Sequence, residues 1–253
     1  MRTVFITGAT SGIGEATARN FAADGNRLII CGRRKDRLET LATQLRNEFG
    51  IDILPLVFDI SSLAETRDAI ENVPDSWKEV DVLINNAGLA AGLNLLHEGE
   101  IDDWERMIDT NIKGLLYVTR LIAPGMIARR RGHIINLGSI AGREVYARGN
   151  VYCATKHAVD GLTQAMRIDF VPFGIKVTQV APGAVETEFA LVRLNGDAVA
   201  AQKIYAGYEP LHAHDIAGII LYIANLPAHV NVNDILITPV AQANNHNFFK
   251  NGI

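Results

Sequence analysis

Tyr152 and Lys156 stand four residues apart, and Ser139 lies thirteen residues before the tyrosine. In a helix, positions i and i+4 share one face, so this spacing sets an ammonium beside a phenol. A free tyrosine has a pKa of about 10, so ionising it at neutral pH costs about 4 kcal/mol. A cation about 4 Å away, at an effective dielectric constant of about 20, offers up to about 4 kcal/mol before desolvation. The spacing therefore suits a tyrosine that acts as a general acid and base near neutral pH.

The pair alone does not establish such a site. A helix that carries one amphipathic tyrosine and one solvated lysine would show the same spacing. The other motifs of the chain, and their order relative to the pair, decide between the two interpretations.

A glycine-rich turn lies between the first predicted strand, 3–7, and the first predicted helix, 14–23. Its residues are Thr7, Gly8, Ala9, Thr10, Ser11, Gly12, Ile13 and Gly14. Glycines allow a close approach of the backbone to a pyrophosphate, and the N-terminus of the helix presents free amides. The position between strand and helix, at the start of a βαβ unit, favours a dinucleotide-binding turn.

The end of the second predicted strand bears on the choice of cofactor. A site for NAD usually offers an acidic residue here, which binds the ribose 2′-hydroxyl. In this chain Gly32 occupies that neighbourhood, and Arg33 and Arg34 follow. Guanidinium groups suit a phosphate, so these arginines favour NADP(H). The alternative is a solvated basic turn with Asp36 as its partner.

Polar residues follow the third and fourth predicted strands. Asp59 could accept a hydrogen bond from the adenine amino group, or could serve as a turn or N-cap residue. The segment Asn85-Asn86-Ala87-Gly88 could pass beside the adenine ribose, or could form a simple turn.

Short β-branched runs alternate along the chain with longer helical patterns. The predicted strands are 3–7, 27–31, 53–57, 82–85, 133–137, 176–181 and 235–238, and the predicted helices are 14–23, 35–48, 64–72, 103–129, 151–170 and 214–224. This alternation implies an α/β fold with a doubly wound parallel sheet of about seven strands and helices on both faces. We expect a single domain over 1–253. The segment 186–209 fits the alternation least well, and we expect it to cover a ligand as a lid.

Composition argues against several classes of function. The net charge of −4 and the pI of about 6.0 disfavour a nucleic-acid or membrane-surface partner. No segment reaches about 18 continuous apolar residues, and 3–7 reads as a strand rather than as part of a signal peptide. Cys31 and Cys153 are too few for a disulfide framework, so we expect reduced thiols in a cytoplasmic protein. The histidines lack metal-ligand spacing, so no metal site is expected.

Together these residues resemble the short-chain dehydrogenase/reductase family over essentially the whole chain. The matching positions are Thr7–Gly14, Asp59, Asn85–Gly88, Asn111, Ser139, Tyr152, Lys156, Pro182-Gly183 and Thr187. The resemblance implies a Rossmann-type fold and hydride transfer to or from a nicotinamide. It also implies a homotetramer or a homodimer, usually formed through the helices near 103–129 and 151–170.

The same resemblance implies a role for each catalytic position. Tyr152 would be the acid and base, and Lys156 would lower its pKa and bind the nicotinamide ribose. Ser139 would hydrogen-bond the substrate oxygen, and Asn111 would hold a water in a proton relay. The residues that would contact the nicotinamide end of the cofactor are Pro182, Gly183, Val185 and Thr187.

A closer resemblance is to the NADP-dependent 3-hydroxy acid dehydrogenases, a group that includes the serine/allo-threonine dehydrogenases. The similar segments are 86–90, 107–111, 149–152, 187–189, 192–193 and 227–231. A hydroxy acid carries a carboxylate, which needs a cation once desolvated. Arg193 matches the group and is the preferred candidate. Arg143 and Arg148 depart from its pattern, and a surface or interface ion pair is the alternative for each of the three arginines.

We therefore expect an NADP-dependent oxidoreductase. It would transfer hydride reversibly between nicotinamide C4 and the alcohol carbon of a 3-hydroxy acid such as serine, allo-threonine or 3-hydroxypropionate. Two alternatives stay open. One is a broad NADPH-dependent reductase of neutral ketones and aldehydes, and the other is a non-catalytic NADP(H)-binding regulator, because a fold does not by itself set a function.

Overall fold

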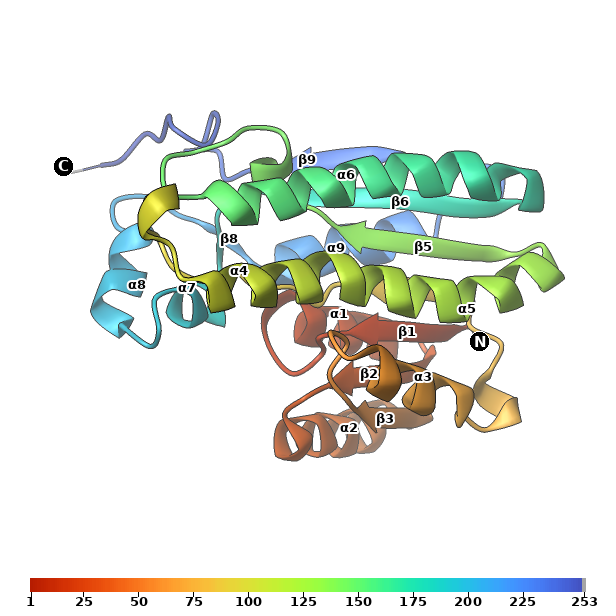
Figure 1. Ribbon diagram of the computed structural model, residues 1–253. Coiled ribbons are helices and arrows are strands. Elements are labelled where there is room, and N and C mark those ends of the chain that lie inside the picture. The colour runs from red at the N-terminus through yellow and green to blue at the C-terminus, as the bar shows by residue number, and fades with distance from the viewer. Residues whose placement is uncertain (252–253) are drawn as a thin grey trace.

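A parallel sheet forms the centre of the molecule. The computed structural model describes residues 1–251, and seven strands cross it in the order β3-β2-β1-β4-β5-β6-β9 (Figure 1). The strands are β1 Thr3–Thr7, β2 Arg27–Gly32, β3 Ile53–Val57, β4 Val82–Asn85, β5 Gly132–Leu137, β6 Ile175–Pro182 and β9 Asp234–Ile237. Every neighbouring pair is parallel. The predicted doubly wound sheet is confirmed.

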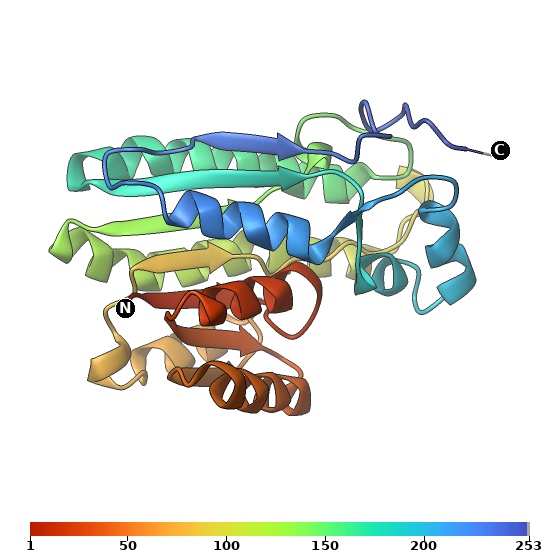
Figure 2. The same ribbon diagram turned by 180° about the vertical axis from the view of Figure 1, so that it is seen from behind.

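Helices cover both faces of the sheet. The helices on one face, which Figure 2 shows toward the viewer, are α1 Gly12–Ala23, α2 Lys35–Phe49 and α9 Ala213–Ala224. Those on the other face, toward the viewer in Figure 1, are α3 Leu63–Glu71, α4 Ile101–Ile108, α5 Leu115–Arg129 and α6 Asn150–Phe170. Within residues 1–251, no helix has the length and apolar character that crossing a membrane requires.

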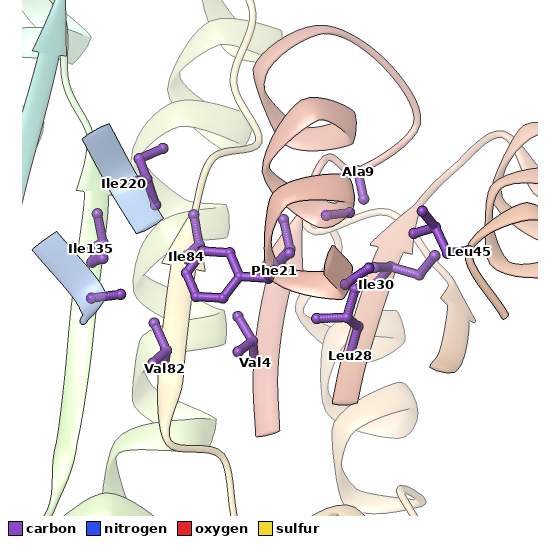
Figure 3. Close-up of a cluster of buried hydrophobic side chains, with 14 of the residues drawn as sticks. Val4, Ala9, Phe21, Leu28, Ile30, Leu45, Val82, Ile84, Ile135 and Ile220 are labelled. Carbon is purple, nitrogen blue, oxygen red and sulfur yellow. The ribbon is translucent and has the colours of Figure 1, made fainter. Parts of the chain in front are cut away.

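Strand residues point alternately into two apolar cores, as the period of two in an extended strand requires. In β1, Val4 packs in the core under α1, α2 and α9, whereas Phe5 packs in the core under α3, α5 and α6. Figure 3 shows the first core, with the ring of Phe21 from α1 beside Val4 and Ile84. Phe21 is fully buried, and such burial contributes roughly 1.5–3 kcal/mol. The two cores hold the strand ends, and so the loops that leave them, in fixed positions.

The predicted helical stretch 103–129 is confirmed, because the backbone is helical without a break from Ile101 to Arg129. A π-helical turn over Asp109–Gly114, which the sequence did not predict, divides this stretch into α4 and α5. Hydrophobic spacing does not reveal such a turn, because the residues on both sides of it remain helical. A π-helical turn is often found at a functional site, and this one carries Asn111.

The segment 186–209 contains two helices that the alternation does not predict, α7 (Glu188–Arg193) and α8 (Ala198–Ile204). Strand β7 (Val185–Glu186) pairs in parallel with β8 (Leu211–His212), so both ends of the segment meet in a small second sheet. Figure 1 shows α7 and α8 beyond the carboxyl ends of the central strands. The 3-10 turns are Asp75–Trp77, Leu96–Glu98, Ile140–Gly142 and Val171–Phe173.

Candidate active site

A cavity of about 610 Å³ opens at the carboxyl ends of the central strands. Strand order reverses between β1 and β4, and such a switch point leaves a crevice for a ligand. The walls come from the turn after β1, the ends of β2 and β4, the loop after β5, the first turns of α6 and the helix α7. These segments are distant in sequence, and the sheet brings them together.

Most of the predicted site residues line this cavity. From the nucleotide half they are Gly8, Thr10, Ser11, Gly12, Ile13, Arg33, Arg34, Asp59, Asn86, Ala87 and Gly88, and from the other half Ser139, Tyr152, Lys156, Pro182, Gly183, Val185, Thr187 and Arg193. Four predicted site residues do not line it. Gly14 and Asn111 pack behind its walls, and Arg143 and Arg148 lie elsewhere.

The turn after β1 allows a close approach of backbone segments. Gly8 and Gly12 have φ angles of +67° and +54°, in the left-handed region that favours glycine. A Cβ on Gly14 would lie 2.2 Å from the carbonyl oxygen of Gly8 and 2.4 Å from Nδ2 of Asn86. The side chain of Ser11 does not cap α1, so the first amides of the helix are available to an anion such as a phosphate. The turn therefore fits a pyrophosphate.

The two arginines after β2 differ in how fully they are engaged. Among residues 1–251, Arg33 pairs only with Asp59, through Nη1 at 3.2 Å, and its side chain is 61% exposed. Arg34 donates to Oγ of Ser11 at 2.7 Å and to the carbonyl oxygen of Thr10 at 3.2 Å, and it pairs with Glu188 at 2.9 Å. Arg33 is therefore the more available of the two for a phosphate.

Asp59 has the contacts of a turn residue as well as a place in the cavity wall. Its Oδ1 accepts from the amide and hydroxyl of Ser61, at 3.0 and 2.8 Å. Burial raises the pKa of Asp59, but these hydrogen bonds and the Arg33 cation outweigh burial and hold it below its usual value. Ser62, not Asp59, caps the following helix. The N-cap alternative for Asp59 is thus excluded, and its carboxylate stays charged in the cavity wall.

Tyr152 and Ser139 meet at the other end. Tyr152 lies in the first turn of α6 and is 8% exposed, and Ser139 lies at the end of β5 with the same exposure. Ser139 accepts from the amide of Ala141 at 3.1 Å, which fixes its loop. Lys156 is also buried, and its Nζ donates to the carbonyl oxygen of Leu137 at 2.8 Å. Three of the four predicted catalytic side chains, those of Ser139, Tyr152 and Lys156, therefore line the cavity.

The pKa values differ from what the resemblance implies. Burial, and secondarily the neighbouring Tyr146, raises the pKa of Tyr152 above its ordinary value, while hydrogen bonding to Ser139 and the Arg193 cation lower it. Burial lowers the pKa of Lys156 to about 8. The Nζ of Lys156 lies 5.9 Å from the centre of the Tyr152 ring, and its hydrogen bond goes to the main chain. In the free protein, Arg193 rather than Lys156 is the cation that lowers the pKa of the tyrosine.

Asn111 joins two parts of the site. Its Nδ2 donates to the carbonyl oxygen of Leu89 at 2.8 Å and to Oγ1 of Thr155 at 3.0 Å, and its Oδ1 accepts from the amide of Leu89. Both side-chain donors are therefore occupied, so a water held at Asn111 would donate to one of its oxygen atoms. In the structure Asn111 ties the segment after β4 to the helix that carries Tyr152.

Arg193 places a buried cation beside Tyr152. It is 9% exposed, its Nη1 donates to the Tyr146 hydroxyl at 2.6 Å, and its Nε donates to the carbonyl oxygen of Gly92 at 3.2 Å. Its Cζ lies 5.5 Å from the centre of the Tyr152 ring. Among residues 1–251, no acidic group forms an ion pair with it. A buried cation without a carboxylate partner suits an anionic ligand.

The other two arginine candidates are placed away from the cavity. Arg143 pairs with Asp160 of α6 at 3.3 Å and with Asp234 of β9. Arg148 borders a small separate hollow near Trp104. Arg143 therefore takes part in an ion pair, which was the alternative for this residue. Its partners Asp160 and Asp234 are distant in sequence, so the sequence could not predict the pairing.

Several lining residues were not predicted from the sequence. They are Tyr146, Phe189, Tyr205, Asn245 and Phe248. The ring of Phe189 lies 5.5 Å from that of Tyr152, centre to centre. Its place in the segment 187–189, which resembles the 3-hydroxy acid dehydrogenases, was a usable signal. The other four reach the cavity only through tertiary folding.

Known proteins with similar sequences belong to the family that these residues resemble. A family model described as short chain dehydrogenase matches residues 2–195. The chain is 44% identical over 241 residues to the NADP-dependent 3-hydroxy acid dehydrogenase YdfG of Salmonella typhi, covering 95% of this chain and 96% of that protein. It is 41% identical over 241 residues to a serine 3-dehydrogenase of Agrobacterium fabrum, covering 95% of each.

Solved structures that resemble this chain include serine dehydrogenases. The closed form of a serine dehydrogenase complexed with NADP+ matches with a TM-score of 0.91 at 41% identity, covering 95% of this chain and 96% of that one. Serine dehydrogenase from Escherichia coli matches with a TM-score of 0.82 at 37% identity, covering 95% of this chain and 99% of that one.

Proposed function

The chain belongs to the short-chain dehydrogenase family, and we propose that it is an NADP-dependent oxidoreductase of 3-hydroxy acids. The reaction is reversible hydride transfer between nicotinamide C4 and the alcohol carbon of a substrate such as serine, allo-threonine or 3-hydroxypropionate. Relatives at 41% and 44% identity carry the names of dehydrogenases for such substrates.

The nucleotide half of the cavity supports NADP(H) as the cofactor. The uncapped start of α1 and the turn 8–13 would hold the pyrophosphate, and Arg33 would hold the 2′-phosphate. Lys156 would bind the nicotinamide ribose, and the segment 182–187 would contact the nicotinamide. When bound, the oxidised cofactor supplies the hydride acceptor.

Tyr152 carries the proton chemistry. In reduction its phenol gives a proton to the carbonyl oxygen, and in oxidation its phenolate takes the proton of the substrate hydroxyl. Burial keeps the pKa raised and so favours the phenol in the free protein. Oxidation needs the phenolate, which Arg193 and the hydrogen bond to Ser139 favour. Ser139 also holds the reacting oxygen.

The single observation that carries the choice of substrate is Arg193. It is a buried cation, 5.5 Å from the ring of the proposed acid and base, and it lacks an acidic partner among the described residues. A substrate carboxylate placed against it would set C3, the hydroxyl carbon two bonds from the carboxylate carbon, near Tyr152. A neutral ketone would leave this cation unpaired, which is costly in a buried site.

Arg193→Met tests this assignment. We expect the KM for 3-hydroxypropionate to rise by about 30-fold or more, because a buried charge pair is lost. The reduction of a neutral ketone should change little. Arg148→Met removes a cation from outside the cavity and is the matched control. Equal effects of Arg193→Met on charged and neutral substrates would contradict the carboxylate role.

The direct test of the proposed function is a panel of 3-hydroxy acids offered to the purified protein with NADP+ and with NAD+. We expect NADPH formation with at least one hydroxy acid, and weaker activity with NAD+. An absence of turnover across the panel, with tight NADPH binding, would instead favour a non-catalytic NADP(H)-binding regulator.

One observation favours a second candidate, the reduction of neutral ketones or aldehydes. The substrate end of the cavity is rich in aromatic and aliphatic side chains, among them Tyr146, Phe189 and Phe248. Such a surface binds apolar carbonyl compounds well. A higher kcat/KM for an uncharged ketone than for any hydroxy acid would select this candidate.

We further propose a cytoplasmic homotetramer built from single-domain chains, with 186–209 as a lid. Ile168 and Val171, near the end of α6, are 73% and 67% exposed, and a subunit contact would bury them. Both cysteines are free and buried, as suits a reducing compartment. Light scattering of the purified protein measures the subunit number, and cell fractionation locates the protein.

A further inference from the structure

Helix α7 runs the length of the cavity, from the nucleotide end to the substrate end. Its N-cap residue Thr187 packs against Gly12, because a Cβ on that glycine would lie 3.3 Å from the threonine side chain. Its last residue, Arg193, reaches Tyr146 and the ring of Tyr152. Between them, Phe189 packs on Tyr152. The position of this one short helix thus sets two contacts to the proposed acid and base.

Glu188, the first residue of α7, ties the helix to the other side of the cavity. One carboxylate oxygen lies 2.9 Å from Nη1 of Arg34, and the other lies 2.8 Å from Nη1 of Arg37. Arg37 belongs to α2, and Arg34 is itself bonded to Thr10 and Ser11 in the nucleotide turn. One carboxylate therefore connects α7, α2 and the turn after β1.

Glu188 is a fixed charge under working conditions. Hydrogen bonds from Arg34 and Arg37 hold its pKa below the usual value, so the carboxylate is ionised at neutral pH. It lies at the opposite end of α7 from Arg193, and five residues of helix span about 7.5 Å. This placement points to a positioning role rather than to proton transfer at the substrate.

We propose that Glu188 is a positioning residue, which anchors α7 to Arg34 and Arg37 and thereby sets Phe189 and Arg193 over Tyr152. Its effect on substrate binding rests on the function proposed above, in which Arg193 binds the carboxylate. The anchoring itself is a property of the free protein. Two arginine functions are then separate: Arg34 and Arg37 hold the lid helix, and Arg33 is left for the cofactor phosphate.

Hydrogen exchange of the cofactor-free protein tests the anchor without any activity. In Glu188→Gln, the amides of 187–194 should exchange about fivefold faster than in the wild type, because two partly exposed ion pairs are lost. Glu186→Gln is the matched control: it removes an equal charge two residues away, from an exposed side chain outside the cavity lining. A change below about twofold, or an equal change in the control, would overturn the anchor.

Salt gives a second test that needs no variant. Both partners of each pair are about half exposed, at 41% and 41% for Arg34 with Glu188 and at 53% and 41% for Arg37 with Glu188. Such pairs are screened as ionic strength rises. Exchange in 187–194 of the wild type should therefore speed up with added salt, while exchange in the buried strand β4 should not. Salt-independent exchange in 187–194 would count against the anchor.

Steady-state kinetics tests the consequence for the substrate. In Glu188→Gln the KM for 3-hydroxypropionate should rise about fivefold while kcat changes by less than about twofold, since Tyr152 and Ser139 are carried by other elements. Glu188→Asp should recover part of the loss. An unchanged KM would overturn the positioning role. A wild type without hydroxy-acid activity would sink the proposed function alone, because the exchange experiments stand apart from it.

Discussion

The neighbours of Tyr152 shift its pKa in opposite directions. Burial raises it, and the hydrogen bond to Ser139 and the cation of Arg193 lower it. Burial also lowers the pKa of Lys156, to about 8. The lysine therefore titrates not far above neutral pH, and its charge is lost above about 8. The acid–base behaviour of the site belongs to this group of residues rather than to the Tyr–Lys spacing alone.

Tyr152→Phe removes only the reacting hydroxyl. We expect NADPH to bind as tightly as in the wild type, because the ring and its packing on Phe189 remain. Turnover should fall by about 100-fold or more, the contribution typical of a general acid or base. Fluorescence titration and steady-state kinetics measure the two quantities. Near-native turnover in this variant would exclude Tyr152 as the acid and base.

Arg33→Glu tests the choice of cofactor. Arg33 is the arginine with the fewest contacts at the nucleotide end, and a reversed charge there would repel a 2′-phosphate. The Kd for NADPH should rise by about 30-fold or more, and that for NADH by much less. Lys35→Glu, which reverses an exposed charge outside the cavity lining, is the control. An equal loss of affinity for NADPH and for NADH would mean that Arg33 does not bind the 2′-phosphate.

At the scale of elements, the site depends on how closely backbone segments approach one another. The turn after β1 and the segment after β4 touch through Gly8, Gly14 and Asn86. The π-helical turn places Asn111 so that it joins the segment after β4 to α6. Each contact needs a particular small or amide side chain at a crossing point, so a single methyl group can displace a whole element.

Gly14→Ala tests this close packing. The new methyl group would lie 2.2 Å from the Gly8 carbonyl oxygen, so the nucleotide turn must move. We expect a loss of about 1–3 kcal/mol in the free energy of unfolding, together with weaker NADPH binding. Gly218→Ala is the matched control in α9, where a Cβ meets nothing within 4 Å, and it should stabilise the protein by about 0.5–1 kcal/mol. Chemical denaturation measures both, and an equal response would contradict the packing argument.

At the scale of the whole molecule, the sheet buries a histidine, His133, that is neutral in the folded protein and becomes protonated when the protein unfolds in acid. His133 lies in β5, next to Thr178 of β6, and its Nε2 is 2.8 Å from the threonine hydroxyl. Among the described residues nothing partners its Nδ1. Burial, with smaller contributions from Lys176 and Arg2, lowers the pKa of His133 from 6.5 to about 3. The folded protein therefore holds this histidine neutral.

Stability should fall in acid because of His133. Between pH 6.5 and about 3 the unfolded chain binds a proton at this residue and the folded protein does not, so the free energy of unfolding falls as pH falls. His133→Gln should flatten this part of the pH profile, while His97→Gln, at an exposed histidine, should not. Urea denaturation at several pH values gives the profile. Identical acid slopes for wild type and His133→Gln would show that another group is responsible.

The seven strands of the central sheet and the helices that flank it were predicted from the sequence to within about two residues, but the π-helical turn inside 103–129 was not. The buried parallel strands are short, near-continuous runs of β-branched or aliphatic residues, a pattern that is typical of strands buried in a parallel sheet. The π-helical turn at 109–114 was not predicted because it keeps the side-chain pattern of a helix. Helices α7 and α8 are only six and seven residues long, so the local pattern did not reveal them.

The sequence by itself determined the chemistry proposed for this protein: a glycine-rich turn after β1, the Ser139–Tyr152–Lys156 set and basic residues after β2 are local patterns whose spacing constrains what they can do. The tertiary structure decided which charges meet. It turned Arg143 toward Asp160 and Asp234, left Arg193 beside Tyr152 without an acidic partner among the described residues, and set Glu188 against Arg34 and Arg37. Charge pairing depends on distances between segments far apart in the chain, and only the packing of the folded elements sets those distances.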